Sequence, residues 1–295
     1  MKPFLFLFYI SLLFCSEDEK YTFLFGGSIR QDVGEKWKYS ASNVMEFKIP
    51  EIGFIKYSSK NISIIEYLGI DGKFAKFKAT LTDMESDNYV NKIEIMDYFR
   101  EAMENNPCYL YVGVLERKRT VNKGSWGRVD HIVPVDPEDD YLQEAYRAAY
   151  MNMYPINLRY PFGYKAVNVA VGDSWMVDYH KSTFYVNMGS PPSQAMSKTT
   201  WTLKKVKNKK GRKIAIIEMQ DSLILDLQIS IDFLGERRLL TGHATGVSDV
   251  VYNWDIDPGE MLKTTSVTHL KGNFEMDDKE FYMRIFMRNI SKKVQ

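Results

Sequence analysis

The sequence predicts a mainly β protein with two tandem, similar halves, each an antiparallel, curved, half-barrel-like sheet, and a few short helices. Aromatic residues are abundant at 14%, with 19 Tyr and 17 Phe, which favours strands. The segment 223–233 alternates apolar and mostly polar residues, the period of a strand with one buried face. A short motif, Val33-Gly34-Glu35-Lys36-Trp37, recurs as Val171-Gly172-Asp173-Ser174-Trp175, and this recurrence predicts an internal repeat.

Residues 1–16 have the features of a signal peptide. Lys2 supplies the positive end, and Phe4–Phe14 is an apolar run too short for a membrane-spanning helix. The stretch ending at Cys15 resembles a bacterial lipoprotein signal, although Phe14 stands where that signal has a small residue. Cys15 is therefore a candidate for lipidation, and simple cleavage near Ser16 is the alternative. We expect an exported protein in the periplasm, in the outer membrane as a lipoprotein, or secreted.

The first predicted β repeat spans residues 21–137. It begins with a strand at 21–25, and the Asp71-Gly72 pair predicts a hairpin turn. Apolar residues at helical spacing predict a short helix over 93–105, and Pro107, which follows soon after, is typical of a helix end. A second helix is expected as a connection over 138–155, where acidic residues occupy the first turn.

The second predicted β repeat spans residues 156–290. Strands over 199–206 and 212–219 flank a lysine-rich segment, 207–211, that is typical of a hairpin tip. Seven Lys and Arg residues between Lys204 and Lys213 favour a solvated surface, and contact with anionic lipid, polysaccharide or nucleic acid is the alternative. The net charge of +1 gives no reason to expect nucleic acid as a partner.

The repeated motif is interpreted as structural. Its glycine can adopt backbone angles that other residues avoid, its acid can accept hydrogen bonds from nearby backbone amides, and its tryptophan can close one end of a core. The residues concerned are Val33, Gly34, Glu35 and Trp37 in one copy, and Val171, Gly172, Asp173 and Trp175 in the other. Sugar stacking on either tryptophan is the alternative interpretation.

The sequence offers no compact set of catalytic or metal-binding residues. The four histidines are widely spaced, so the sequence predicts no metal site and no cofactor. Asp178 and His180 could form a catalytic base, but a pair on the protein surface is the favoured interpretation. The segment 255–259 could bind calcium, but a turn stabilised by Asp side chains is favoured there. Cys108 is expected to be a small buried apolar residue.

The motifs also resemble those of an uncharacterised family of secreted and lipoprotein-like bacterial proteins, described only as a domain of unknown function. The resemblance rests on Pro161 followed by Val167–Trp175, and on the glycine-rich strand 242–246 followed by the turn 255–259. It implies a signal peptide and two related β-rich halves. It implies no activity, cofactor or catalytic residue.

Three functions follow as hypotheses. The first is a non-catalytic cell-envelope protein that binds a hydrophobic ligand or a protein partner, because a curved sheet lined by aromatic residues can hold a lipid or another apolar molecule. The second is a structural or interaction module that offers sheet edges and faces to an envelope protein. The third is a hydrolase whose site is assembled from distant residues. Membrane attachment is expected only through a lipid anchor on Cys15.

Overall fold

A computed structural model describes most of the chain beyond its first residues. The described ranges are 20–23, 32–49, 53–90, 93–94, 107–115, 125–134, 167–184, 191–233, 236–257 and 260–294. All regular structure in these ranges is β-strand, and the principal sheet is antiparallel, so the predicted mainly β class is confirmed. Cys15 and the rest of segment 1–16 lie outside the described residues.

Fourteen strands are present in the described ranges. They are β1 (Tyr21–Phe23), β2 (Lys36–Ile49), β3 (Gly53–Asp71), β4 (Phe74–Val90), β5 (Ile93–Glu94), β6 (Cys108–Leu115), β7 (Ser125–Pro134), β8 (Val167–Val169), β9 (Ser174–Phe184), β10 (Ser193–Lys209), β11 (Arg212–Phe233), β12 (Glu236–Asp255), β13 (Glu260–Met276) and β14 (Lys279–Val294). Several of them are far longer than an ordinary strand of five or six residues.

The strands form one large sheet with the order β7-β6-β4-β3-β2-β14-β13-β12-β11-β10-β9, and β5 pairs with β4 beside this path. The last strand, β14, joins β2 in antiparallel register from Arg284 opposite Lys48 to Val294 opposite Lys38. Both predicted repeats therefore contribute to the same continuous sheet. Separately, β1 pairs with β8 as a two-stranded ribbon.

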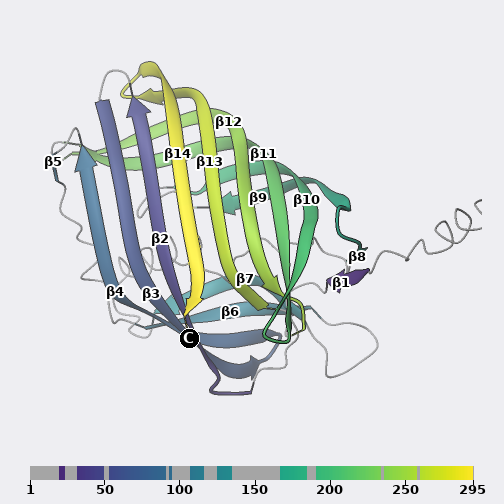
Figure 1. Ribbon diagram of the computed structural model, residues 1–295. Helices are drawn as coiled ribbons and strands as arrows, with labels where there is room; N and C mark the ends of the chain where they lie inside the picture. Colours follow the sequence, from purple (N-terminus) through teal and green to yellow (C-terminus); the bar gives the residue numbers. More distant parts are fainter. Residues whose placement is uncertain are drawn as a thin grey trace, which may run out of the picture.

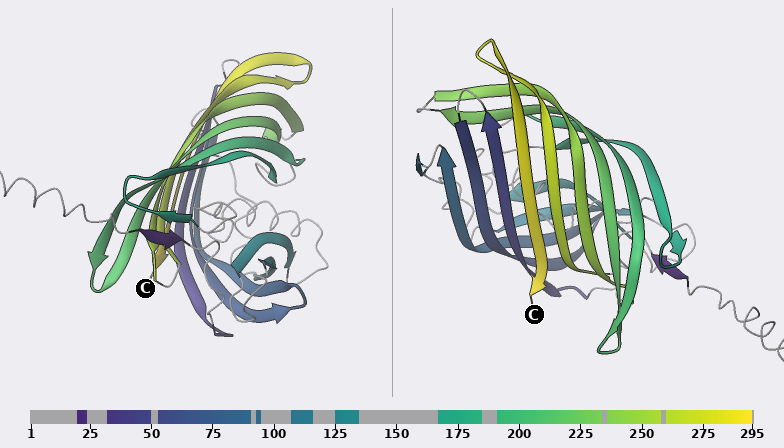
Figure 2. Two further views of the ribbon diagram at one scale, coloured as in Figure 1. Left: turned by 90° about the vertical axis from the view of Figure 1, so that its right-hand side faces the viewer. Right: turned by 45° about the horizontal axis from the view of Figure 1, so that its top comes forward.

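The sheet is strongly curved, as twisted sheets of many strands tend to be. Figure 1 shows β14 and its neighbours running from top to bottom, with β3, β4, β6 and β7 turning across the lower end and β11 and β12 across the upper end. In the left view of Figure 2, both ends bend toward the same side. We call the face on that side the concave face.

Two groups of buried apolar side chains share one face of the sheet, which we assign to the concave side because only that side of a curved sheet is enclosed by its own strands. The lower cluster, which contains Tyr67, Trp201 and Tyr252, draws residues from β2–β4, β6, β8 and β10–β13. The upper cluster, which contains Phe47, Leu225 and Phe274, draws residues from β2, β3 and β10–β14. Their members alternate with outward residues because successive side chains of a strand point to opposite faces.

Several local predictions are confirmed. Leu223, Leu225, Leu227 and Ile229 are buried while the residues between them are not, as the alternation over 223–233 predicted. The Asp71-Gly72 hairpin joins β3 to β4, and Gly72 has a φ of 59°. The lysine-rich segment does form a hairpin tip, although β10 and β11 extend so far that only Lys210 and Gly211 remain between them.

Other predictions are corrected or lie beyond the described residues. Ile93 and Glu94, expected to begin a helix over 93–105, form strand β5 against Tyr89 and Val90. Residues 95–105 and the helix expected over 138–155 fall outside the described ranges. The last strand continues to Val294, beyond the expected end of the second repeat at residue 290, because its pairing with β2 extends that far.

Candidate ligand-binding site on the concave face

A row of polar side chains crosses the concave face between the two clusters. Ser266 of β13, Asn289 of β14, Asn43 of β2 and Ser59 of β3 are paired in register. Asn43 Nδ2 donates to Ser59 Oγ at 3.4 Å, and Asn289 Nδ2 donates to Ser266 Oγ at 3.3 Å. None of the four is buried, so this row, which we call the polar row, is an open part of the concave face.

An apolar row lies directly beside the polar row, on the side of the upper cluster. Met287, Met45 and Tyr57 are paired across β14, β2 and β3, and all three are half-buried and packed against the upper cluster. We call these three residues the methionine row. Methionine adapts its shape to different apolar partners, and Tyr57 meets Phe47 edge-on with ring centroids 6.0 Å apart.

Two buried polar side chains border the polar row on the side of the lower cluster. Asn61 follows Ser59 on the same face of β3, and Ser291 follows Asn289 on the same face of β14, with Ala41 of β2 between them. Asn61 is 3% exposed and Ser291 is 9% exposed. Asn61 Nδ2 and Ser291 Oγ have no hydrogen-bond partner among the described residues, which is costly for buried polar atoms.

Polar residues continue across the other half of the sheet, where they are buried. Thr199 of β10, Asp221 of β11, Ser248 of β12 and Thr268 of β13 are paired in register at the level of the methionine row. Thr199 Oγ1 donates to Asp221 Oδ1, and the hydroxyls of Ser248 and Thr268 are 2.7 Å apart. A polar belt therefore separates the lower from the upper cluster along most of the sheet.

The two copies of the repeated motif form the same backbone turn. Gly34 N donates to Tyr67 O, Tyr67 N donates to Glu35 O, and Glu35 N donates to Asp32 O, at 2.7, 3.0 and 2.9 Å. In the second copy, Gly172 N donates to Leu203 O at 2.7 Å, Leu203 N donates to Asp173 O at 3.1 Å, and Asp173 N donates to Ala170 O at 3.1 Å. The two glycines have φ values of 89° and 99°, in the left-handed region.

The hairpin that follows each motif also has the same irregularity. A β-bulge interrupts the pairing of β3 with β4 between Tyr67 and Gly69, and another interrupts β10 with β11 between Leu203 and Lys205. Both bulges come directly after the residue that bonds to the motif glycine. A bulge increases local twist, so each motif lies where its hairpin bends.

The motif side chains do not lie at the polar row. Trp37 and Trp175 both pack against the lower cluster, where Trp37 meets Phe77 at 6.1 Å and Trp175 stacks on Trp201 at 6.4 Å between ring centroids. Asp173 Oδ2 accepts a hydrogen bond from Ala170 N at 2.9 Å. The side chains of Val33, Glu35 and Val171 are exposed.

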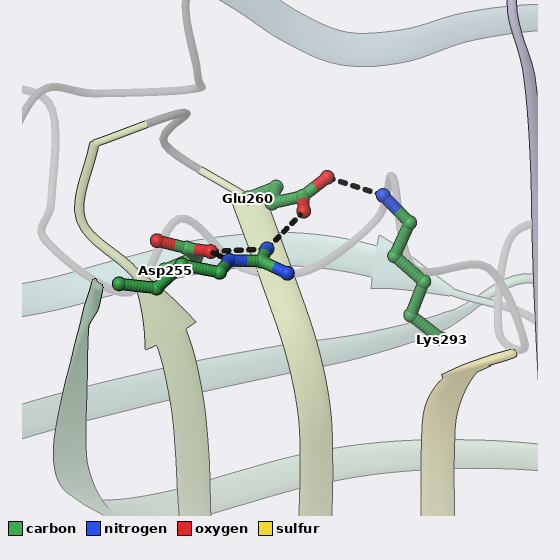
Figure 3. A network of polar contacts seen from close by, with 4 residues as sticks. Asp255, Glu260 and Lys293 are labelled. Carbon is green, nitrogen blue, oxygen red and sulfur yellow. Dashed lines mark hydrogen bonds and ion pairs between the residues drawn. The ribbon is translucent and has the colours of Figure 1, made fainter. Parts of the chain in front are cut away.

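A charged network closes the lower ends of β11–β14 (Figure 3). Arg212 binds the carboxylate of Asp255 and lies 3.0 Å from Glu260 Oε1, and Lys293 binds Glu260 Oε2. Asp255 is 1% exposed, whereas Arg212 is half exposed. Nearby, burial raises the pKa of the Tyr39 hydroxyl far above its usual range, and the carboxylates of Glu260 and Glu35 raise it further.

The remaining candidates from the sequence do not gather at one place. His243 lies 2.8 Å from Asp226 on the convex face, and His269 contacts Phe286 on that same face. The side chains of Asp178 and His180 lie outside the described set. Within the described ranges, no three His, Cys, Asp or Glu side chains are placed to hold a metal ion, and no helix could cross a bilayer. Cys108 is fully buried in the lower cluster.

A shallow depression of about 320 Å³ lies where β3 and β4 bulge apart. Its lining includes Lys60, Asp83 and Glu85, and the Lys60 ammonium pairs with Glu85 at 2.9 Å. Asn61, Ile62 and Ile290 also line this depression, so it combines apolar surface with charged groups and adjoins one of the two buried polar side chains that border the polar row.

Comparison with known proteins identifies no family. No protein-family model matches the chain, and no curated protein matches it. Among solved structures, a similar course of the chain occurs in lipovitellin, in a structure that concerns lipid–protein interactions in that protein. The match has 11% sequence identity and a TM-score of 0.44, covers 90% of this chain, and spans only 25% of the lipovitellin chain.

Proposed function

We propose that this is an exported, non-catalytic protein of the cell envelope that holds a lipid or another apolar ligand on its concave face. One observation carries the proposal: the open part of that face places the methionine row directly beside the polar row, between two apolar clusters. An amphipathic molecule needs this combination, because its apolar part requires a dry surface and its polar part requires hydrogen-bonding groups.

The charged and titratable groups support a binding role over catalysis. His243 and Asp226 are paired on the convex face, with side chains 61% and 71% exposed, away from the polar row. Catalytic groups act on a bound molecule only from within hydrogen-bond reach. Export is supported by Lys2 and the apolar run 4–14, and a lipid on Cys15 would attach the protein to a membrane.

Replacing a methionine of the methionine row by lysine should abolish ligand retention. Met45→Lys and Met287→Lys each place an ammonium group against the apolar part of the ligand, and desolvating that charge is costly. The full chain, exported from its own host and purified without detergent, is analysed by native mass spectrometry and lipid extraction. We expect a bound lipid on the unchanged protein and at least a tenfold loss, about 1.4 kcal/mol, in both variants.

Val44→Lys is the matched control, because Val44 is also half-buried but points to the opposite face of the same strand. It should retain the lipid. Thermal unfolding of all three variants separates loss of ligand from loss of fold. If the unchanged protein carries no apolar molecule, or if Val44→Lys loses it as completely as Met45→Lys, binding at the concave face is wrong.

We also infer that the chain consists of two structurally equivalent halves, each opened by one copy of the motif. The matching hydrogen bonds of Gly34 and Gly172 and the matching bulges after Tyr67 and Leu203 support this inference. The strand order supports it too, since β7-β6-β4-β3-β2 and β13-β12-β11-β10-β9 run in the same sense on either side of β14.

Equivalent turns should respond equally to substitution. A Cβ at Gly34 or Gly172 meets no atom within 4 Å, so Gly34→Ala and Gly172→Ala test backbone conformation alone. Each should lower the free energy of unfolding by about 1–2 kcal/mol, because L-residues rarely adopt these φ values. Chemical denaturation measures both. A cost at one glycine and none at the other would argue against equivalence.

An interaction module is the second candidate. Leu239, Val247 and Val251 of β12 are large apolar residues that are each about two-fifths exposed on the convex face. Exposed apolar residues that recur along one strand can bind another protein. Native mass spectrometry of the exported chain distinguishes the candidates, because an envelope protein bound in fixed ratio, with no lipid present, would favour the module.

A further inference from the structure

The concave face carries almost no charge at the level of the polar row. We compared the residues of β2, β3 and β10–β14 that are paired in register with the polar row, the methionine row or the Asn61–Ser291 pair. Among those that the structure describes, Asp221 is the single charged side chain. It is fully buried, lies four strands from Met45, and accepts a hydrogen bond from Thr199.

The lack of charge is specific to this face of the strands. On the opposite face at neighbouring levels, β2 carries Glu46 and Lys48, β3 carries Lys56 and Lys60, and β14 carries Arg288. On the inward face of these strands the nearest basic residue is Lys293 of β14, which lies one pair beyond Ser291 and is bound to Glu260. The nearest ammonium groups, Lys60 beside Asn61 and Lys293 beyond Ser291, are already paired with Glu85 and Glu260, so a phosphate or carboxylate bound at the polar row would find no unpaired cation at these levels.

The polar groups bordering this region have hydrogen-bonding capacity left over, and that capacity includes donors. Asn61 Nδ2 carries N–H groups and Ser291 Oγ carries an O–H, and neither atom has a partner among the described residues. The Asn61 carboxamide oxygen is already engaged, since it accepts from Ser63 Oγ at 3.4 Å. These groups suit a ligand that supplies neutral acceptor oxygens.

We propose that the ligand is an uncharged acyl ester of the diacylglycerol type, an inference that rests on the proposed function. Its ester carbonyl oxygens accept hydrogen bonds from Asn61 Nδ2 and Ser291 Oγ, with side-chain rotation on binding. Its glycerol and ester part lies over the polar row, and its acyl chains extend from there over Met287, Met45 and Tyr57 toward the upper cluster. A single molecule can reach both donors, because two neighbouring strand spacings, roughly 10 Å, separate their backbones.

An anionic lipid fits the same region poorly. A carboxylate or phosphodiester that leaves water needs a cation or several strong donors, and an unpaired ion in an apolar setting costs far more than a neutral ester. The polar row offers only amides and hydroxyls, the single charge paired in register with these rows, Asp221, is negative, and Lys60 and Lys293 are already bound to Glu85 and Glu260. The electrostatics of the face therefore select for a neutral polar part.

The test presents three lipids to the full chain. Dioleoylglycerol, oleic acid and dioleoylphosphatidylglycerol are delivered from cyclodextrin in equal amounts, and native mass spectrometry measures the occupancy of each. We expect dioleoylglycerol to exceed each anionic lipid by at least about tenfold, equivalent to about 1.4 kcal/mol. Equal or greater occupancy by oleic acid or dioleoylphosphatidylglycerol would overturn the neutral-ester inference while leaving lipid binding intact.

Two variants locate the selectivity. Asn61→Leu, made together with Ser63→Ala so that no hydroxyl loses its acceptor, and Ser291→Ala each remove one donor. Each should weaken dioleoylglycerol binding by about threefold to tenfold, the value of one hydrogen bond. The thermal midpoint of the empty protein should stay constant or rise, because a buried group without a partner has been removed.

Ser42→Ala, on the convex face of β2, is the control and should bind dioleoylglycerol like the unchanged protein. Variants that fold normally and keep full affinity for dioleoylglycerol would show that Asn61 and Ser291 do not contact the ester. If none of the three lipids binds, the proposed function itself fails, which is a different result from altered selectivity.

Discussion

Gly246→Ala is expected to lower the free energy of unfolding by about 3 kcal/mol, because the added methyl group has no space. A Cβ at this position would lie 1.9 Å from His269 O on the paired strand. Gly272 and Gly242 are similarly enclosed, at 2.0 Å from His243 O and 2.3 Å from the Phe274 ring. These three glycines lie on the concave face of β12 and β13, beside the upper cluster, and let the two strands approach closely as the sheet bends.

Denaturant unfolding monitored by circular dichroism measures the effect. Thr245→Val is the matched control, since Thr245 directly precedes Gly246 in β12 and is exposed on the opposite face, and valine is also β-branched. It should change stability by less than about 0.5 kcal/mol. A Gly246→Ala protein as stable as the control would mean that β12 and β13 are not packed as closely as the structure places them.

Arg212→Met is expected to lower the free energy of unfolding by about 2–3 kcal/mol. The substitution removes the ion pair of Asp255, whose carboxylate is 1% exposed and whose Oδ1 atom has no hydrogen-bond partner among the described residues. Removing one partner of a buried pair costs about 3–5 kcal/mol, and the half-exposed position of Arg212 reduces that figure. The Glu260 carboxylate also loses its contact with Arg212, but the energetic cost there is smaller because Lys293 still pairs with it.

Lys60→Met is the control for this prediction. It breaks the Lys60–Glu85 pair, which has a short contact of 2.9 Å but side chains 69% and 72% exposed, and it should lower the free energy of unfolding far less than Arg212→Met does. Adding Asp255→Asn to Arg212→Met should recover part of the lost stability, because no buried charge then remains. Equal effects of Arg212→Met and Lys60→Met would contradict the importance of burial at Asp255.

The sequence was sufficient to predict strands and their faces where one pattern dominated. The alternation predicts the buried face of β11 correctly over 223–229, because Leu223, Leu225, Leu227 and Ile229 are apolar and buried. The Asp71-Gly72 pair predicts its hairpin because only a few residues tolerate positive φ. The start of the expected helix at Ile93 is wrong, because pairing with Tyr89 and Val90 prevails over helical spacing.

The candidate site was not predictable in the same way, although β14 contains a usable signal. On its inward face the residues change from Met283, Ile285 and Met287 to Asn289 and Ser291 without a break in the strand. A similar change from apolar to polar occurs within β2, where Phe47 and Met45 give way to Asn43. The meaning of each change depends on register.

The sequence does not show which residues of distant strands are paired with one another in the sheet. Met45 and Met287 are more than 240 positions apart (287 minus 45), and they become neighbours only because β14 pairs with β2. The repeated motif drew attention to Trp37 and Trp175, which instead pack into the lower cluster. The candidate site lies instead where the last strand, β14, joins the first long strand, β2.

Photo-crosslinking tests binding at the concave face most directly. A dioleoylglycerol analogue with a diazirine in one acyl chain is bound to the full chain, activated by light, and located by peptide mass spectrometry. Our account predicts adducts on Met45, Tyr57 and Met287, which form the methionine row. Adducts confined to convex-face residues such as Val247 and Val251, or labelling that excess unlabelled dioleoylglycerol does not reduce, would contradict it.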